Sequence, residues 1–182
     1  MATTDSKTAD GETTQRDKTQ REKTQRGTAR VTLPSDTEIL ITREFNAPRR
    51  LVYRAWTEPE LISRWWAGQR GRVLSAEVDL RVGGAWRYVM EANGGFEVAF
   101  HGEFREIVPQ ERLVQTEIFE GVPDAVAVST TEFAEKDGRT TLTLLVKHAN
   151  KQDRDMHVNS GMEGGMQEGF DLLEQIAVEL AE

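Results

Sequence analysis

Cysteine is absent from the 182-residue sequence. A disulfide framework, a thiol nucleophile and a thiolate metal site are therefore excluded, and the usual setting of such a chain is a reducing compartment. The sequence also lacks any apolar run approaching the roughly 18 residues that span a bilayer. The opening residues, MATTDSKTADGETTQ, lack the apolar core of a secretion signal. We therefore expect a soluble, cytoplasmic protein with no membrane span.

Large apolar side chains are almost missing from the first 30 residues. This segment carries a nearly identical five-residue repeat, TQRDK, TQREK and TQRGT, over residues 14–28. Five residues is not a helical, heptad or solenoid period, and nothing in the segment offsets the entropy lost on ordering. We therefore predict a disordered polar tail over residues 1–36 and one folded domain over residues 37–182. A functional alternative for the tail is a tether or a weak contact with an anionic surface.

Basic residues are outnumbered in the rest of the chain. The formal net charge is −8, but residues 31–182 hold 16 basic and 26 acidic residues, whereas residues 1–30 hold seven and five. The body of the protein is thus strongly acidic and would repel a phosphate backbone. We expect no nucleic-acid partner.

Hydrophobic periodicity predicts a strand, two short helices, six strands and a long helix, in that order. The predicted strands lie at about 39–45, 73–79, 84–91, 97–107, 112–119, 126–135 and 139–148, with the two short helices between 46 and 66. Asn93-Gly94-Gly95 and Asp137-Gly138 are strong hairpin turns, because primed turns need positive φ. An antiparallel meander followed by one helix packs most economically with that helix across one face of the sheet.

The stretch Asp155–Glu182 predicts the long helix. An apolar stripe recurs along it every three or four residues: Met162, Met166, Phe170, Leu173, Ala177 and Leu180. Four glycines fall in its first half, and each interior one costs about 1 kcal/mol relative to alanine. We predict that Asn159 or Ser160 caps the helix and that Leu172–Leu180 closes the core. The glycine-rich half should lie close to the strands or bend, as the adjustable wall of a pocket.

Four segments resemble, in order, the motifs of one known family: FNAPRRLVYRAWTEPELISRWW, DLRVGGAWRYVM, HGEFREIVPQERLVQTE and SGMEGGMQEGFDLLEQIA. From about Thr37 to Glu182 the chain is similar to the activator-of-heat-shock-protein-90-ATPase-homologue group of the START-like (SRPBCC) superfamily. The resemblance implies an α+β helix-grip fold: a curved antiparallel sheet wraps around a long C-terminal helix, and two short helices follow the first strand. It also implies a cavity between sheet and helix, since START-like relatives bind lipids, polyketides or other apolar molecules and some are cyclases.

The eukaryotic activators of this group carry an additional N-terminal domain. The first 36 residues of this chain are too few and too polar to replace it. Chaperone activation is therefore not carried over from the family name alone.

Three histidines are candidates for metal or acid–base chemistry. His148 and His157 flank Asp153 and Asp155, but this spacing matches no recognised zinc arrangement, and a solvated turn explains it better. His101 lies in the middle of a predicted strand and faces either a cavity, as a base, or solvent. We expect no metal and no cofactor.

Glu117 is the carboxylate with two contrasting interpretations. If it points inward, it is a partly desolvated acid with a raised pKa that can donate or abstract a proton. Otherwise it lies at a cavity mouth or on the outer surface, paired with Arg112 or Arg87. We favour the second interpretation.

Aromatic and methionine side chains indicate where a cavity would lie. Trp86, Tyr88 and Met90 share one face of a predicted strand, and the methionines of the last helix provide an adaptable wall. The alternative is a filled core. We predict that the cavity is lined by Trp65, Trp86, Tyr88, Met90, Glu117, Phe119, Met162, Met166 and Phe170.

Three functional hypotheses follow. In the leading one, the domain binds a small apolar molecule (a lipid, polyketide or aromatic compound) between sheet and helix, without established catalysis. The second is a protein-interaction module, either chaperone-linked or homodimeric. The third is a cyclase or hydrolase that uses Glu117 or His101 with an arginine; no G-x-S-x-G nucleophile elbow is present to support a serine hydrolase.

Overall fold

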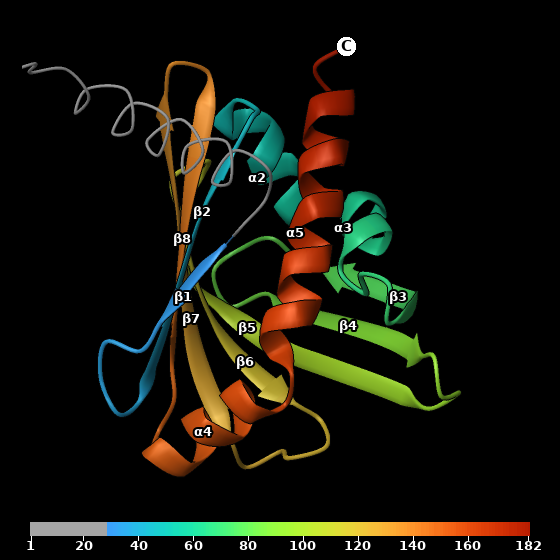
Figure 1. Cartoon of the computed structure of the whole chain (residues 1–182), viewed down its shortest axis with the longest axis vertical. Helices are drawn as coiled ribbons and strands as arrows, with labels where there is room; N and C mark the ends of the chain where they lie inside the picture. Colours follow the sequence, from blue (N-terminus) through green and yellow to red (C-terminus); the bar gives the residue numbers. More distant parts are fainter. Residues whose placement is uncertain (1–28) are drawn as a thin grey trace, which may run out of the picture.

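The computed structural model describes residues 29–182, which form a curved antiparallel sheet and the helices that it encloses (Figure 1). The strands are β1 Arg30–Thr32, β2 Glu38–Phe45, β3 Gly71–Val78, β4 Ala85–Ala92, β5 Glu97–Val108, β6 Arg112–Phe119, β7 Val126–Lys136 and β8 Arg139–Lys147. The helices are α2 Arg49–Thr57, α3 Pro59–Trp65, α4 Lys151–Asn159 and α5 Met162–Glu179. The α+β helix-grip fold is confirmed.

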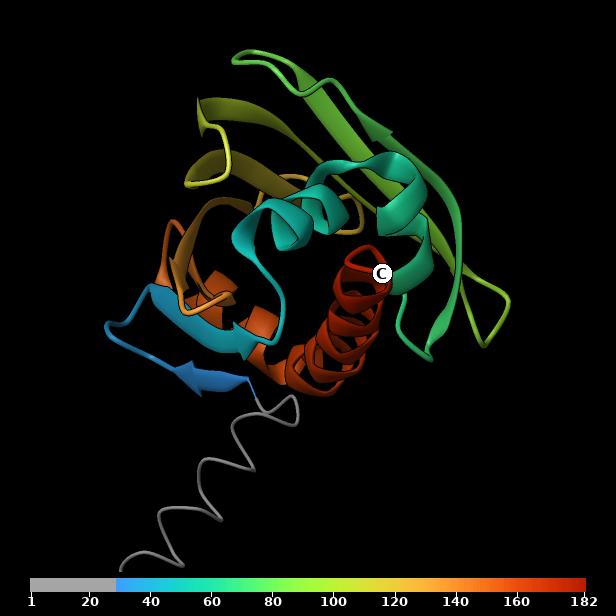
Figure 2. The ribbon, with the colours of Figure 1, turned by 90° about the horizontal axis from the view of Figure 1, so that it is seen from above.

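The eight strands are ordered β1-β2-β8-β7-β6-β5-β4-β3, and every neighbouring pair is antiparallel. Seen from above, the sheet curves around α5 and the α2–α3 pair (Figure 2). The concave face therefore holds the buried layer of the protein, and strand alternation decides which side chains reach it.

Alternation is clearest on β2, where Ile39, Ile41, Arg43 and Phe45 are all buried. Arg43 is the unexpected member, because its side chain is fully buried among apolar neighbours. Its guanidinium donates to Asp171 and to Glu174 on α5, each at 2.8 Å. These two ion pairs join β2 to the middle of α5; we call them the Arg43 clamp.

The core beneath the C-terminal half of α5 is closely packed. Phe170, Leu173, Ile176 and Ala177 are each at most 3% exposed. Phe170 lies edge-on to Phe45 with ring centroids 5.8 Å apart. This half of α5 closes the core, as the apolar stripe predicts.

Two segments differ from the expected elements. Residues 151–159, expected to be a turn, form α4, with the Asn150 side chain capping it by accepting from the Asp153 N–H at 2.9 Å. This helix buries only Arg154, so it carries no apolar stripe from which to predict it. Gly161, with φ of 79°, precedes α5 without a side-chain cap, so the predicted caps Asn159 and Ser160 are wrong.

The ordered sheet begins inside the stretch expected to be a polar tail. β1 pairs with β2, placing Val31 opposite Ile41. Just before it, the backbone of buried Ala29 exchanges two hydrogen bonds with the side-chain amide of Gln167 on α5, at 2.8 and 2.7 Å. The TQR repeats lie outside the described residues.

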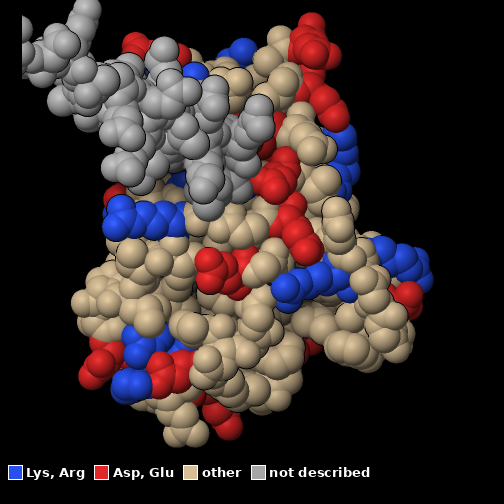
Figure 3. Space-filling model, viewed as in Figure 1, with Lys and Arg blue, Asp and Glu red and all other residues tan. Residues whose placement is uncertain are grey.

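Acidic side chains follow α5 on the surface. Figure 3 shows them gathered along the course of this helix, whose sequence includes Glu163, Glu168, Asp171, Glu174 and Glu179. In residues 29–182, no helix has both the length and the apolar character needed to cross a membrane.

Candidate functional site

The concave face is covered unevenly. On β2, β7 and β8 most inward side chains are nearly inaccessible: Ile39, Leu142 and Phe133, for example, are at most 3% exposed. On β4 to β6, beside the first half of α5, several inward side chains remain half-buried, and Phe119 is 39% exposed. The five predicted site residues on strands lie on this second part of the concave face.

Five rings form a continuous layer on this part of the face; we call Trp66, Trp86, Tyr88, Phe100 and Phe119 the aromatic face. Strand register places Tyr88 opposite Phe100 and Phe100 opposite Phe119. Trp66, which follows α3, lies edge-on to Tyr88 and Phe100, with ring centroids 5.4 and 5.6 Å away. Phe100 and Phe119 are 5.2 Å apart, and Trp86 and Tyr88 are 4.8 Å apart.

Trp86 is the most enclosed ring of the aromatic face. Its indole N–H donates to the Thr116 carbonyl at 3.1 Å, and only 3% of the residue is exposed. The neighbouring position on β5 is Gly102, where an added Cβ would lie 2.6 Å from the indole nitrogen and 1.8 Å from the Thr116 oxygen. A glycine is thus required for Trp86 to lie flat across β5 and reach β6.

Glu117 lies on β6, on the same side of the strand as Phe119. It is enclosed by protein but retains some accessible surface, and Ser129 Oγ on β7 donates to its Oε2 at 3.1 Å. Burial raises the pKa of the Glu117 carboxyl, against smaller lowering effects from the Ser129 hydrogen bond and from His148. Burial, and to a smaller extent the neighbouring Glu117 charge, also raises the pKa of the Tyr88 phenol.

The expected pairing of Glu117 with an arginine is therefore wrong. Arg87 instead pairs with Glu120 at 2.7 Å, and Arg112 pairs with Glu106 and Glu132. Both arginines project to the convex face because their strand positions are out of phase with Glu117. The inward carboxylate has no ion-pair partner among the described residues.

Two histidines meet next to this site. His148, just after β8, and His157, on α4, approach with Nε2 and Nδ1 3.1 Å apart. Burial is the main cause that lowers the pKa of both imidazoles, and for His148 the proximity of His157 lowers it further. The expected solvated turn is thus a helix whose histidine contacts the end of β8.

No metal cluster forms among residues 29–182. Asp153 is engaged at the start of α4 with Asn150, and Asp155 pairs with Lys151 and Arg154. Both carboxylates therefore have partners in α4 or in its N-cap residue and do not join the two histidines.

His101 lies outside the concave site. Register places it opposite Arg87 on the convex face, and its Nδ1 lies 3.1 Å from Glu120 Oε1. The Arg87 hydrogen bond, with help from His101, lowers the pKa of Glu120 to about 2. This exposed trio cannot reach a molecule held beneath α5.

The remaining predicted site residues divide between core and wall. Trp65 and Phe170 belong to the packed core, where both rings contact Trp56. Met162 and Met166, in the first half of α5, are half-buried against the edge of that core. The third methionine, Met90, is half-buried near the end of β4, where its Cε would lie 2.9 Å from a Cβ added at Gly71.

The glycines of α5 do not face the strands, contrary to expectation. An added Cβ at Gly164 would lie 2.6 Å from Nη2 of Arg70, and one at Gly165 would lie 3.2 Å from its Nε. At Gly169 the added atom would lie 3.2 Å from the Trp65 carbonyl oxygen. The glycines therefore admit the α3–β3 connection against α5.

Sequence reasoning missed Ser129 and His148 as neighbours of Glu117, and His157 as the partner of His148. Ser129 is in phase with the buried Thr131 and Phe133 on β7, so alternation could have placed it on the concave face. The histidine contact joins two elements, one of which was not predicted, and no local pattern reveals it.

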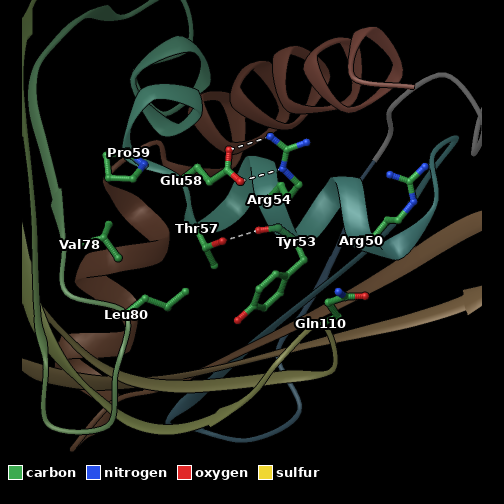
Figure 4. A pocket seen from close by; sticks show the side chains of 9 residues that line it. All are labelled: Arg50, Tyr53, Arg54, Thr57, Glu58, Pro59, Val78, Leu80 and Gln110. Atoms are coloured by element: carbon green, nitrogen blue, oxygen red, sulfur yellow. Dashed lines mark hydrogen bonds and ion pairs between the residues drawn. The ribbon is translucent and has the colours of Figure 1, made fainter. Parts of the chain in front are cut away.

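A separate hollow of about 530 Å³ lies beside α2 (Figure 4). Tyr53 and Thr57 point from α2 toward the strands, Val78 is the last residue of β3, and Leu80 and Gln110 lie in the β3–β4 and β5–β6 connections. It contains none of the nine predicted residues, so it is distinct from the aromatic face.

Residues 46–177 match the family model described as Activator of Hsp90 ATPase homolog 1-like protein. The chain belongs to this family. The predicted family membership is confirmed, and the match covers α2 through most of α5, including every predicted site residue. A comparison with curated proteins found no match.

Solved structures of this family type share the fold. A protein from Nitrosomonas europaea is 27% identical with a TM-score of 0.73, covering 82% of this chain and 99% of its own. An AHSA1-like protein from Aeromonas hydrophila is 25% identical with a TM-score of 0.59, covering 78% and 93%. A protein from Rhodobacter sphaeroides, at 24% identity, has a TM-score of 0.76 and covers 84% and 98%.

Proposed function

We propose that this domain binds a small apolar molecule between the aromatic face and the first half of α5. The observation that carries the proposal is the uneven covering of the concave face. Side chains that point inward from a sheet are normally sealed by the opposite layer, as on β2 and β7. Beside β4 to β6 they keep accessible surface, and covering each 100 Å² of apolar area would contribute about 2.5 kcal/mol.

The composition of the opposite wall supports the same function. Met162 and Met166, in the first two turns of α5, are only partly buried and pack against the edge of the core. Methionine is flexible and polarizable, so it adapts to ligands of different shape. With aromatic rings on one side and methionines on the other, the lining suits a lipid, a polyketide or an aromatic compound.

The remaining predicted residues have graded roles in this proposal. Tyr88, Glu117 and Phe119 would face the ligand directly, with Met90 at one end. Trp65, Trp86 and Phe170 are more deeply buried and would form the floor behind the contact surface.

A thermal-shift screen with fatty acids, polyketides and aromatic compounds tests the proposal. A ligand at one hundred times its dissociation constant should stabilise the fold by about 2.7 kcal/mol. Met162→Trp should abolish that stabilisation by filling the space, while the unliganded protein still melts cooperatively. Met156→Trp, on the 43% exposed Met156 of α4, is the matched control and should bind like the wild type. Absence of stabilisation by every compound, or equal binding by the two variants, would refute the proposal.

An interaction with a 90-kDa heat-shock protein is the second candidate function. It is favoured by the family description, which names homologues of an activator of the Hsp90 ATPase. A pull-down with the bacterial chaperone followed by an ATPase assay tests it. An ATPase rate that does not respond to the domain would remove this candidate.

A further inference from the structure

We infer that Glu117 makes the proposed site selective for an organic cation, an ammonium group attached to an apolar body. The inference rests on the proposed function and adds the charge and chemical class of the ligand. Two independent features support this inference. Glu117 is an inward carboxylate without a cationic partner among the described residues, and the aromatic rings beside it make no cation–π contact there.

The carboxylate is the first feature. Two nearby carboxylates on the convex surface have arginine partners: Glu120, just after β6, pairs with Arg87, and Glu132 on β7 pairs with Arg112. Glu117 faces the other way and receives one recorded hydrogen bond, from Ser129 to Oε2. Among the described residues no Lys, Arg or His nitrogen lies within ion-pair distance of it. A buried carboxylate that is ionised is normally paired, so the complement that an ionised Glu117 lacks is a positive group.

The neighbouring histidines do not supply that charge. His148 is the nearest, but it is buried and hydrogen-bonded to His157, and a proton on either ring would be opposed by burial. Tyr88, the other titratable group beside Glu117, is neutral when protonated. At neutral pH the side chains around Glu117 therefore contribute no compensating positive charge.

The aromatic face is the second feature. Ring faces attract cations electrostatically, and the attraction is stronger when the pair is desolvated. Trp66, Tyr88, Phe100 and Phe119 are incompletely covered and adjacent to one another. The cation–π contact recorded in residues 29–182 is elsewhere, between Arg43 and Phe45 at 5.0 Å. An ammonium group near Glu117 would meet both a carboxylate and π faces, with its apolar chain along Met162 and Met166.

Three ten-carbon probes separate charge from apolar contact: decyltrimethylammonium, decanol and decanoate, each below its micelle concentration. Their dissociation constants are measured by calorimetry at pH 8 against the full chain. The wild type should bind the cation at least about tenfold more tightly than decanol, and decanoate least tightly. Glu117→Gln should bring the affinity for the cation to within about twofold of the affinity of the same variant for decanol.

Glu103→Gln is the matched control, because Glu103 carries the same charge on the exposed convex side of β5; it should keep the wild-type preference. Phe119→Leu, at a partly exposed position that tolerates change, should weaken the cation more than decanol even if Glu117→Gln unfolds. Equal binding of cation and decanol by the wild type would overturn the selectivity and leave the proposed function standing. Failure of all three probes to bind would count against the proposed function itself.

Discussion

Arg43→Met is expected to destabilise the fold strongly, because it breaks the Arg43 clamp from its buried end. The Arg43 side chain is fully buried, Glu174 is 16% exposed and Asp171 is 50% exposed. Removing one member of a buried ion pair costs about 3–5 kcal/mol, mainly because the other charge is left uncompensated. Because Asp171 can turn to solvent, we expect the lower end of this range for Arg43→Met. The expected loss is about 3 kcal/mol, which corresponds to roughly a hundredfold change in the unfolding equilibrium constant.

Urea denaturation followed by tryptophan fluorescence measures this change. With an m-value of roughly 1–3 kcal/mol per molar, the midpoint should fall by about 1 M or more. The double variant Arg43→Met/Glu174→Gln should recover much of the lost stability, because it removes the uncompensated charge of Glu174. In the wild type the Asn46 N–H donates to Glu174 Oε1 at 2.8 Å, and the amide oxygen of the glutamine can still accept this hydrogen bond. A midpoint for Arg43→Met within 0.2 M of the wild type, or a double variant no better than the single one, would refute the reasoning.

Three further predictions concern the carboxylate, the histidine pair and the glycine face. Because the folded-state pKa of Glu117 is raised above its ordinary 4.5, its contribution to stability is full below pH 4.5 and is lost as pH rises through the folded pKa. Urea titrations should therefore show that the free energy of unfolding of Glu117→Gln rises relative to that of the wild type as pH increases over this range. A difference between the two that does not change with pH would contradict the burial of Glu117. The pKa values of His148 and His157 are lowered from 6.5. Their contribution to the stability of the fold is therefore present above pH 6.5 and is lost as pH falls through the folded-state pKa values. His157→Gln should make the free energy of unfolding depend less on pH in this acid range, and an unchanged pH dependence would argue against the histidine pair. Gly164→Ala should raise stability by up to about 1 kcal/mol through helix propensity. The new Cβ would crowd only the flexible end of the Arg70 side chain, which can move away. A lower melting temperature for the variant would mean that Arg70 cannot move.

Local patterns were sufficient for strands β2 to β8 and for the half of α5 that packs into the core. Period-two alternation placed Trp86, Tyr88 and Met90 on one face, and the register confirms this phase. Paired turn residues such as Asp137 and Gly138, both at positive φ, located a hairpin. These features depend on residues a few positions apart, which a sequence displays directly.

The misjudged features depend on contacts between distant residues. Alternation put Arg43 in phase with Ile41 and Phe45, but nothing local indicates that Asp171 and Glu174, some 130 positions later, pair with it. α4 was missed because a helix that buries one side chain needs no apolar stripe. For Glu117 the favoured prediction, a carboxylate at a cavity mouth or on the outer surface paired with an arginine, was wrong. Its side chain points inward and accepts from Ser129 on the neighbouring strand, a contact between residues twelve positions apart.

The two halves of α5 meet different requirements, and the Arg43 clamp lies between them. Between the two carboxylates of the clamp and beyond them, Leu173, Ile176 and Ala177 are buried in the core. Before it, Gly164 and Gly165 admit Arg70 on one side, while methionines and half-covered rings lie on the other. A helix held this firmly at its middle can shift its first two turns without opening the core, because Met162 and Met166 lie only at the edge of the core. Ligands of different size should therefore change the exposure of Met162 and Met166 in α5 while leaving amide exchange at Leu173 to Ala177 unchanged.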